Sequence, residues 1–407
     1  MKRERHTAAV LGATGLGALL LLTGCAGTGS DDSAARAEGT AEEEEEIPHG
    51  YVEGAEETGE PQSRLVVADT ATGDVRVLDL ITEEVTELDP VPGVDGITGD
   101  GRFAYLRSSD PGSTDIVDSG AWTVDHGDHS HYYRAGIGHV GAIDGFAARA
   151  AVTDPALASL VDERGSARIL DRSALEDGTV EPVAVGSDDS ATALPFAGRL
   201  VVAEGGSDGQ VRVHDREGAK LRVLDGTCAD PAGAAVSRRG LVIGCEEGTL
   251  HVTEDDDALH AETLPYPDGG ARTESFHHRP GSAVLAALST DGDVWVLDLS
   301  EPAWTRLDVP DAVAVNAVGE DTFVLVLTAD GSLRSLDPET GEEVAEVALL
   351  DGTDGDPAPT IQIDTSRAYV NDAEAGVVHE IDYNDDLRVA RTLDTGIAPH
   401  LMVETGR

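Results

Sequence analysis

An all-β fold is predicted for this sequence of 407 residues from two observations, a repeated strand pattern and the complementary character of its two ends. Residues 64–79 contain an apolar strand, a Gly-Asp turn and an alternating strand, and the same pattern returns at residues 199–215. Six similar units begin near Arg102, Phe146, Gly240, Ala283, Phe323 and Arg367. A spacing of about forty residues is the period of a four-stranded propeller blade. We therefore predict a β-propeller of eight blades, or of seven if two of the units merge.

The two ends of the repeat predict how the ring closes. The unit that begins at Arg64 has no strand before it that could serve as its innermost strand. Residues 398–404 read as a single strand without a blade of its own. If this strand completes the first blade, it also removes open sheet edges, which promote aggregation.

The N-terminal segment, residues 1–24, is interpreted as a secretion signal. A short basic stretch precedes an apolar run that is too short to span a membrane. The run ends in Leu22-Thr23-Gly24-Cys25, which resembles the bacterial lipobox, so Cys25 is expected to carry a lipid. The protein would then be anchored to the outer face of the cell membrane or lie in a periplasm. A cleaved signal followed by an ordinary cysteine is the alternative.

Residues 25–60 are interpreted as a disordered acidic tether that precedes the propeller domain of residues 61–407. The segment is rich in Gly, Ser and Ala and includes five consecutive glutamates, so it has little apolar surface to bury. His49 lies in this arm and is either simply solvated or an accessory first contact for a cation.

The net charge of −50 excludes nucleic acid as a partner, because a phosphate backbone would be repelled. Residues 1–24 contain three basic residues and one acidic residue, so the chain without them carries −52. An excess of acid raises the local cation concentration, but it is equally typical of a salt-tolerant surface. The charge by itself therefore does not indicate a metal site.

Two cysteines, Cys228 and Cys245, follow Cys25 and fall on adjacent strands of one repeat. In an oxidising compartment such a pair is expected to form a disulfide. A cysteine metal site is the less favoured reading, because no CxxC spacing is present.

One short stretch concentrates metal-binding side chains more densely than any other part of the chain. Within six residues it holds three imidazoles and a carboxylate, namely His126, Asp128, His129 and His131. Neutral imidazoles and carboxylates suit zinc, and three or four of them complete a tetrahedron. The alternative is a solvated hairpin end that is rich in histidine by chance.

The flanking residues predict how this stretch folds. Strand-forming residues lie on both sides of residues 127–128, which can form a two-residue hairpin turn. His126 and His129 then lie opposite one another. The period of two residues in strands adds His131 and Tyr133 to the same face. Tyr133 is therefore an accessory candidate for the site.

A second group of candidates follows from the position of residues in the repeat. The innermost strand of each blade lines the central channel, so residues that begin these strands approach one another at one mouth. The residues in such positions are Asp95, His139, His277, His278 and His400. We expect at least two of them to share a metal, although a histidine at a strand entry is often only a loop residue.

The pattern His126-x-Asp128-His129-x-His131-x-Tyr133, with a histidine-bearing arm before the first blade, resembles the secreted zinc chaperones of the AztD type. The resemblance covers residues 61–404 and implies a β-propeller that binds Zn²⁺ outside the cytoplasm. It also implies delivery of the zinc to the solute-binding protein of a zinc ABC transporter. His139, His278 and His400 are added by position and not by the motif. The arm departs from the pattern because it offers only His49 and glutamates.

Two other classes of function stay open at this stage. A propeller enzyme that depends on a quinone or a metal is one, although no nucleophile or general base accompanies the histidine motif and aromatic residues make up only 4% of the chain. A metal-free scaffold for protein interactions is the other. The ligand types also leave copper and nickel open beside zinc, and they do not say whether one or two ions bind.

Overall fold

The computed structural model describes residues 52, 54–126, 129–185, 191–204, 208–267, 272–320, 322–353 and 355–407. The chain divides into two compact units, Met1–Pro48 and His49–Arg407, and all described residues belong to the second. No helix among them is long and apolar enough to cross a membrane. The predictions for Cys25, for His49 and for the glutamate run fall outside the described residues.

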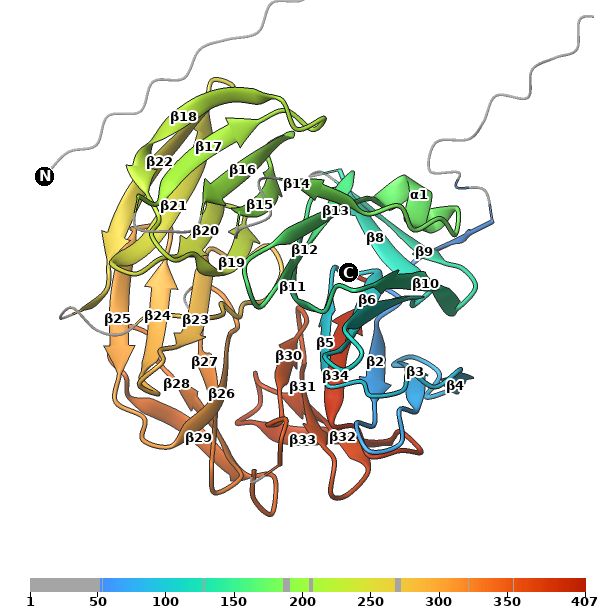
Figure 1. Cartoon of the computed structure of the whole chain (residues 1–407). Helices are drawn as coiled ribbons and strands as arrows, with labels where there is room; N and C mark the ends of the chain where they lie inside the picture. The colour runs from blue at the N-terminus through green and yellow to red at the C-terminus, as the bar shows by residue number, and fades with distance from the viewer. Residues whose placement is uncertain are drawn as a thin grey trace, which may run out of the picture. The chain divides into compact units, whose positions relative to one another are not determined.

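The prediction of an all-β fold is confirmed. Eight antiparallel sheets that follow the repeat succeed one another along the described chain (Figure 1). The first is formed by β34 (Leu401–Thr405), β2 (Arg64–Ala68), β3 (Val75–Asp79) and β4 (Val85–Leu88). The second is formed by β5 (Gly96–Gly99), β6 (Phe103–Ser108), β7 (Ser113–Asp118) and β10 (Gly138–Asp144).

Sheets three to five repeat this order without a break. The third contains β11 (Ala148–Thr153), β12 (Leu157–Asp162), β13 (Ala167–Asp171) and β14 (Val183–Val185), with the short helix α1 (Arg172–Glu176) before its last strand. The fourth contains β15 (Ala191–Phe196), β16 (Arg199–Glu204), β17 (Gln210–His214) and β18 (Lys220–Thr227). The fifth contains β19 (Ala232–Ser237), β20 (Gly240–Gly244), β21 (Gly248–Asp255) and β22 (Ala258–Pro265).

The last three sheets complete the series. The sixth contains β23 (Val284–Leu288), β24 (Val294–Asp298) and β25 (Ala303–Leu307). The seventh contains β26 (Ala312–Ala317), β27 (Val324–Thr328), β28 (Ser332–Leu336) and β29 (Glu343–Ala348). The eighth contains β30 (Ile361–Ile363), β31 (Ala368–Asp372), β32 (Val377–Asp382) and β33 (Arg388–Asp394). In the sixth sheet, isolated bridges from His277 to Ala286 of β23 and from Thr273 to Ser289 directly after β23 stand in for a regular first strand.

The last strand of each sheet is less buried than the second strand, which explains the strong and weak halves of the repeat. All five residues of β2 are buried because strands flank it on both sides and neighbouring sheets cover both faces. In β29, the last strand of the seventh sheet, exposed residues alternate with partly buried ones. An outer strand therefore needs only one apolar face, so its sequence signal is weaker.

The sheets are held together by apolar clusters that run from each sheet to the next. Val66 of β2 packs with Leu106 of β6, which joins the first sheet to the second. On its other face, Leu65 of β2 packs with Tyr369 of β31, which joins the first sheet to the eighth. Comparable clusters join every other neighbouring pair of sheets. The buried core is therefore continuous from sheet to sheet.

The C-terminal strand joins the first sheet, as predicted. Residues of β34 pair with β2 from Arg64↔Thr405 to Ala68↔Leu401. The end of the chain thereby supplies the first sheet with the strand that the sequence before Arg64 lacks.

A hairpin interrupts the second sheet between its third and fourth strands. Its strands, β8 (Ala121–Asp125) and β9 (Ser130–Arg134), leave the sheet and pair with β1 (Glu56–Thr58) in the order β1-β9-β8. The prediction that a disordered tether extends to residue 60 is therefore wrong at the C-terminal end of the tether, where β1 forms. The Glu-Glu-Thr sequence of β1 carries no apolar alternation, and its order comes from pairing with β9.

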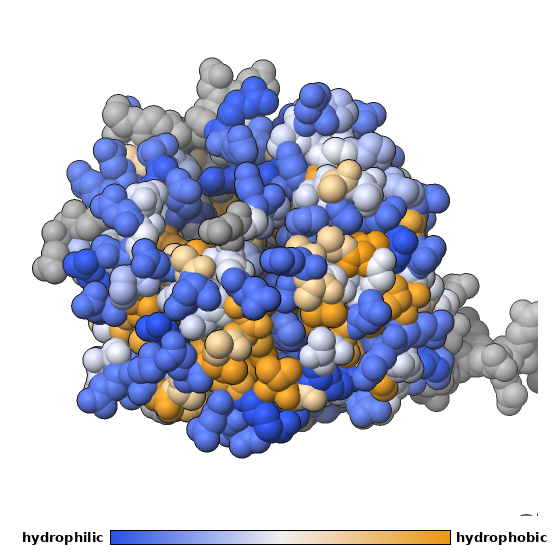
Figure 2. Space-filling model, turned by 90° about the horizontal axis from the view of Figure 1, so that it is seen from below, coloured by the Kyte–Doolittle hydropathy of each residue, from blue (hydrophilic) through white to orange (hydrophobic). Residues whose placement is uncertain are grey.

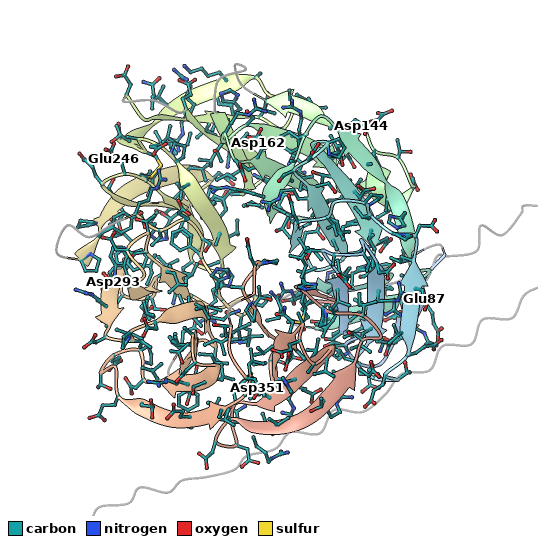
Figure 3. All side chains as sticks on the ribbon, turned by 60° about the horizontal axis from the view of Figure 1, so that its bottom comes forward. Glu87, Asp144, Asp162, Glu246, Asp293 and Asp351 are labelled. Atoms are coloured by element: carbon teal, nitrogen blue, oxygen red, sulfur yellow. A yellow bond between two sulfur atoms is a disulfide. The ribbon has the colours of Figure 1, made fainter. Side chains whose placement is uncertain are left out.

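The surface matches the acidic composition. Figure 2 shows a face dominated by hydrophilic residues, with smaller apolar areas between them. The carboxylates labelled in Figure 3 come from sheets all around the unit, and Glu87, Asp144, Glu246 and Asp351 among them are exposed.

The predicted disulfide between Cys228 and Cys245 is present in the fifth sheet. Cys228 precedes β19 and Cys245 follows β20, and both residues are buried. The bond therefore ties together the beginning and the end of the first hairpin of this sheet.

Replacing both cysteines with alanine is expected to lower the free energy of unfolding by about 3 kcal/mol, since the bond closes a loop between residues 17 apart. Denaturant unfolding of the double variant, beside reduced and oxidised wild type, measures this difference. Equal stability of all three proteins would contradict a stabilising role for the disulfide.

Candidate metal centre

The register of the β8–β9 hairpin brings three histidines to one face. Val124 pairs with His131, and the backbone N–H of His126 donates to the carbonyl of His129 at 2.9 Å. Because side chains alternate along strands, His126, His129 and His131 project from the same side. This is the arrangement that the sequence predicts. The predicted turn, Gly127 and Asp128, lies outside the described residues.

The base of the hairpin is fixed by aromatic packing on the second sheet. Trp122 stacks on Tyr133 with ring centroids 5.2 Å apart. The guanidinium of Arg102 lies over the Trp122 ring, 3.8 Å from its centroid, and is itself paired with Asp118 at 2.8 Å. Burial, followed by the nearby charge of Glu57, raises the pKa of Tyr133. Tyr133 is thus a neutral packing residue at the foot of the site.

The three imidazoles converge closely enough to share one ion. One ring nitrogen from each of His126, His129 and His131 lies within 4.8 Å of the other two. The Nε2 atoms of His129 and His131 are 3.1 Å apart. Zinc bonds of about 2.0–2.1 Å at tetrahedral angles would place two ligand nitrogens about 3.3 Å apart. The spacing of this pair therefore suits a tetrahedral ion with little movement.

The histidines differ in exposure, which gives the site an open side and a closed side. His126 and His129 are exposed, whereas His131 is only 9% exposed. An ion can therefore reach the outer two imidazoles directly from solvent, and the third holds it toward the body of the protein.

A carboxylate that the sequence does not single out, that of Glu57, contacts the third histidine. Glu57 of β1 lies opposite Tyr133 of β9, and its Oε1 is 2.7 Å from Nδ1 of His131. No local signal distinguishes Glu57 from the many glutamates around it. Its role depends on the pairing of β1 with β9, residues more than seventy positions apart.

The structure does not bring His139 to the entry of the third sheet, which corrects the prediction. His139 lies exposed in β10, the outer strand of the second sheet, with Nε2 3.0 Å from the carbonyl of Asp89. The reason is the inserted hairpin, because of which the fourth strand of the second sheet comes later in the sequence than the repeat predicts. The strand that contains His139 therefore ends this sheet, and the third begins at Ala148.

The remaining candidates lie near strand entries, but apart from the three histidines. Asp95 precedes β5 and pairs with Arg107 at 2.7 Å. Burial raises its pKa, but hydrogen bonds from Arg107 and Ser109 outweigh this and lower the pKa overall. His400 precedes β34 and has its Nδ1 3.4 Å from Oδ1 of Asp69. Each of these groups thus already has a charged partner.

His277 and His278 belong to the irregular segment before β23. Nε2 of His277 is 2.9 Å from the Ser275 hydroxyl, and Nδ1 of His278 is 2.8 Å from the carbonyl of Arg279. His277 is exposed, and His278 is half-buried. Within the described ranges, His126, His129 and His131 form the one group of three or more candidate ligands close enough to hold an ion. The channel-mouth residues therefore form no such group of three in the described chain, and the sharing of a metal by two of them stays a prediction.

Comparison with known proteins adds to this geometry. No protein-family model matches the sequence. The zinc chaperone AztD of Citrobacter koseri is 27% identical over 236 residues, which cover 53% of this chain and 55% of that protein. The match spans about half the length of this relative.

Solved structures extend the likeness over most of the chain. The crystal structure of Citrobacter koseri AztD superposes with a TM-score of 0.71 at 21% identity, over 85% of this chain and 98% of that one. The chain is similar to the zinc chaperone AztD. The apo form of AztD gives a TM-score of 0.72 with the same coverage.

The fold by itself does not separate AztD from enzymes. Dihydro-heme d1 dehydrogenase NirN superposes with a TM-score of 0.55 at 15% identity, over 86% of this chain and 76% of that one. The sequence match, in contrast, is to AztD, which is named a zinc chaperone.

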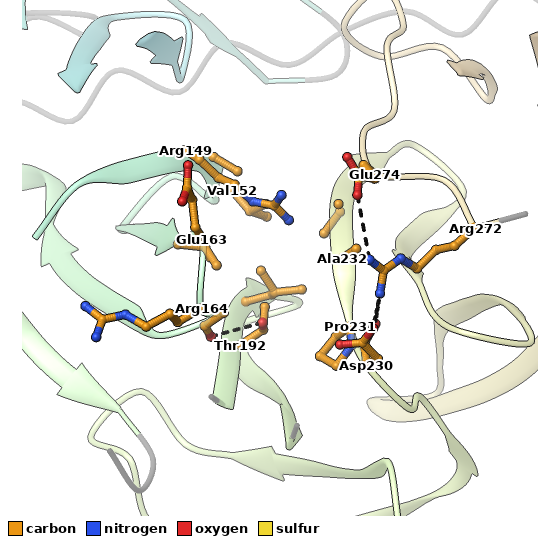
Figure 4. Close-up of a pocket in the computed structure, with 16 residues that line it drawn as sticks. Arg149, Val152, Glu163, Arg164, Thr192, Asp230, Pro231, Ala232, Arg272 and Glu274 are labelled. Atoms are coloured by element: carbon orange, nitrogen blue, oxygen red, sulfur yellow. Dashed lines mark hydrogen bonds and ion pairs between the residues drawn. The ribbon is translucent and has the colours of Figure 1, made fainter. Parts of the chain in front are cut away.

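A cavity of about 260 Å³ lies among the third, fourth and fifth sheets, on other elements than the three histidines (Figure 4). Its charged lining consists of Arg149, Glu163, Arg164, Asp230, Arg272 and Glu274. Arg272 lies between Asp230 and Glu274 and pairs with both. The described lining residues include no histidine, cysteine or serine. The described lining therefore offers no imidazole or thiol as a metal ligand.

Changing any of His126, His129 or His131 to alanine is expected to weaken zinc binding by roughly 100-fold or more. Loss of a residue that only orients a metal ligand costs about 10–100-fold in affinity, and loss of the ligand itself should cost at least as much. His139→Ala is the matched control and should leave affinity unchanged, since His139 lies in another sheet. Competition titration against a zinc chelator measures these affinities. Undiminished zinc binding by His126→Ala/His129→Ala would contradict this site.

Proposed function

We propose that the protein is an extracytoplasmic zinc chaperone that holds one zinc ion on the β8–β9 hairpin and passes it to the solute-binding protein of a zinc ABC transporter. The observation that carries the proposal is the convergence of three imidazoles, with ring nitrogens within 4.8 Å, on a hairpin open to solvent. The likeness to AztD, named a zinc chaperone, supports it independently.

The donor set favours an ion that is held firmly and still released. Three imidazoles leave one position of a zinc tetrahedron for a fourth ligand, which we assign to Asp128 or to water. Imidazoles hold zinc without thiolates and lose it when they are protonated. Because His126 and His129 are exposed, a partner's ligands can approach the ion before the protein's own ligands leave it.

We infer that the eight sheets are the blades of one closed propeller. The pairing of β34 with β2 and the apolar clusters between neighbouring sheets support this arrangement. In such a ring the inserted hairpin is presented by a rigid body, so its partner meets the three histidines in a fixed orientation.

We further propose that the protein works outside the cytoplasm, on the outer face of the cell membrane or in a periplasm, anchored through lipid on Cys25. The disulfide of the fifth sheet supports an oxidising compartment. Residues between Cys25 and β1 would then link the membrane to the hairpin that holds zinc.

The transfer step is tested by mixing the zinc-loaded protein with the zinc-free solute-binding protein in the presence of a chelator that captures free zinc. Direct transfer predicts that the solute-binding protein fills faster than zinc dissociates into the chelator alone. If the solute-binding protein gains zinc no faster than zinc dissociates into the chelator, the zinc passes through solution. This result would contradict the chaperone role.

A further inference from the structure

The contact between Glu57 and His131 bears on the protonation of the histidine ring as well as on the packing of the hairpin. Oε1 of Glu57 is 2.7 Å from Nδ1 of His131, a short distance typical of a hydrogen bond to a charged acceptor. A carboxylate accepts hydrogen bonds and donates none, so the proton between these atoms lies on Nδ1 of His131. The neutral ring then presents the lone pair of its other nitrogen, Nε2.

That lone pair points toward the place where zinc would bind. Nε2 of His131 is 3.1 Å from Nε2 of His129, inside the group of converging nitrogens. Histidines that ligate zinc commonly donate their second N–H to a carboxylate, which fixes the tautomer and makes the ligating nitrogen a better donor. Glu57 is placed to meet this requirement.

We propose that Glu57 is a positioning residue for zinc, which holds His131 in the tautomer and the ring orientation that bind the ion. The inference rests on the proposed function and names a residue that acts on the same site without touching the ion. It assigns a function to β1, whose three residues otherwise only extend the edge of the hairpin sheet.

The neighbouring glutamate provides a matched control. Glu56 and Glu57 lie side by side in β1, but Glu56 contacts Arg134 at 2.8 Å while Glu57 contacts His131. Removing either side chain changes the charge by the same amount on the same strand. Only Glu57→Ala, however, removes the acceptor from Nδ1 of His131. A difference in zinc affinity between the two variants therefore reports the orientation of the His131 ring and not the loss of one negative charge.

The test compares the full-length wild type with Glu57→Ala, Glu56→Ala and Glu57→Gln by chelator competition with Zn²⁺. Glu57→Ala should weaken zinc binding 10–100-fold, the range found for partners that orient metal ligands, and Glu57→Gln should fall between it and wild type. Glu56→Ala should stay within about twofold of wild type. Circular dichroism checks that all variants remain folded.

Nitrogen-15 NMR of the histidine rings in the zinc-free protein gives a readout that a structural role would not move. The wild type and Glu56→Ala should show His131 protonated on Nδ1, and Glu57→Ala should lose this preference. Equal zinc affinity and equal His131 tautomers in the Glu56→Ala and Glu57→Ala variants would overturn the role of Glu57 while leaving zinc binding by the hairpin intact. Zinc binding by wild type no tighter than by His126→Ala/His129→Ala would instead overturn both proposals.

Discussion

The pairing register between β8 and β9 is the constraint on which the candidate zinc site depends. The pair Val124↔His131 and the hydrogen bond from His126 to His129 set which side chains share a face. A shift of one residue in one strand would turn its histidines to the opposite face and separate the ligands. Packing of Trp122 on Tyr133 and of Arg102 on Trp122 opposes such a shift, because it fixes the base of the hairpin.

The rest of the fold supplies a rigid support for this hairpin. β7 and β10, the strands that flank the insertion, pair with each other in the second sheet, so both ends of the hairpin are held. The second sheet in turn shares buried apolar clusters with the first and the third. Closure of the chain by β34 stabilises the first sheet. The three candidate ligands thereby lie on a hairpin that is held by a packed core but is not buried in it.

Much of this arrangement could be predicted from local sequence. Three histidines at alternating positions around a two-residue turn indicate a shared face, and strand periodicity is a strong local signal. The disulfide between Cys228 and Cys245 and the pairing of β34 with β2 were predictable because each resolves an unpaired group or edge. These inferences needed the repeat and the chemistry of single residues, and no knowledge of distant contacts.

The predictions that failed depended on features that local sequence does not reveal. His139 was misplaced because the length of the hairpin insertion decides whether it belongs to the second sheet or the third, and the repeat alone does not reveal an insertion. β1 and Glu57 were hidden within an acidic segment whose composition indicates disorder. Their structure comes from an edge of β9 that only the folded hairpin offers. Sequence patterns therefore identified the three candidate ligand histidines but missed the carboxylate beside His131.

The central claim, that these three imidazoles hold zinc together, is tested most directly by X-ray absorption at the zinc edge on the complex with one equivalent of the metal. The account predicts nitrogen or oxygen ligands at about 2.0–2.1 Å, with the multiple scattering of three imidazoles and no sulfur at about 2.3 Å. A spectrum with one imidazole or none, in a complex that retains the metal, would contradict it.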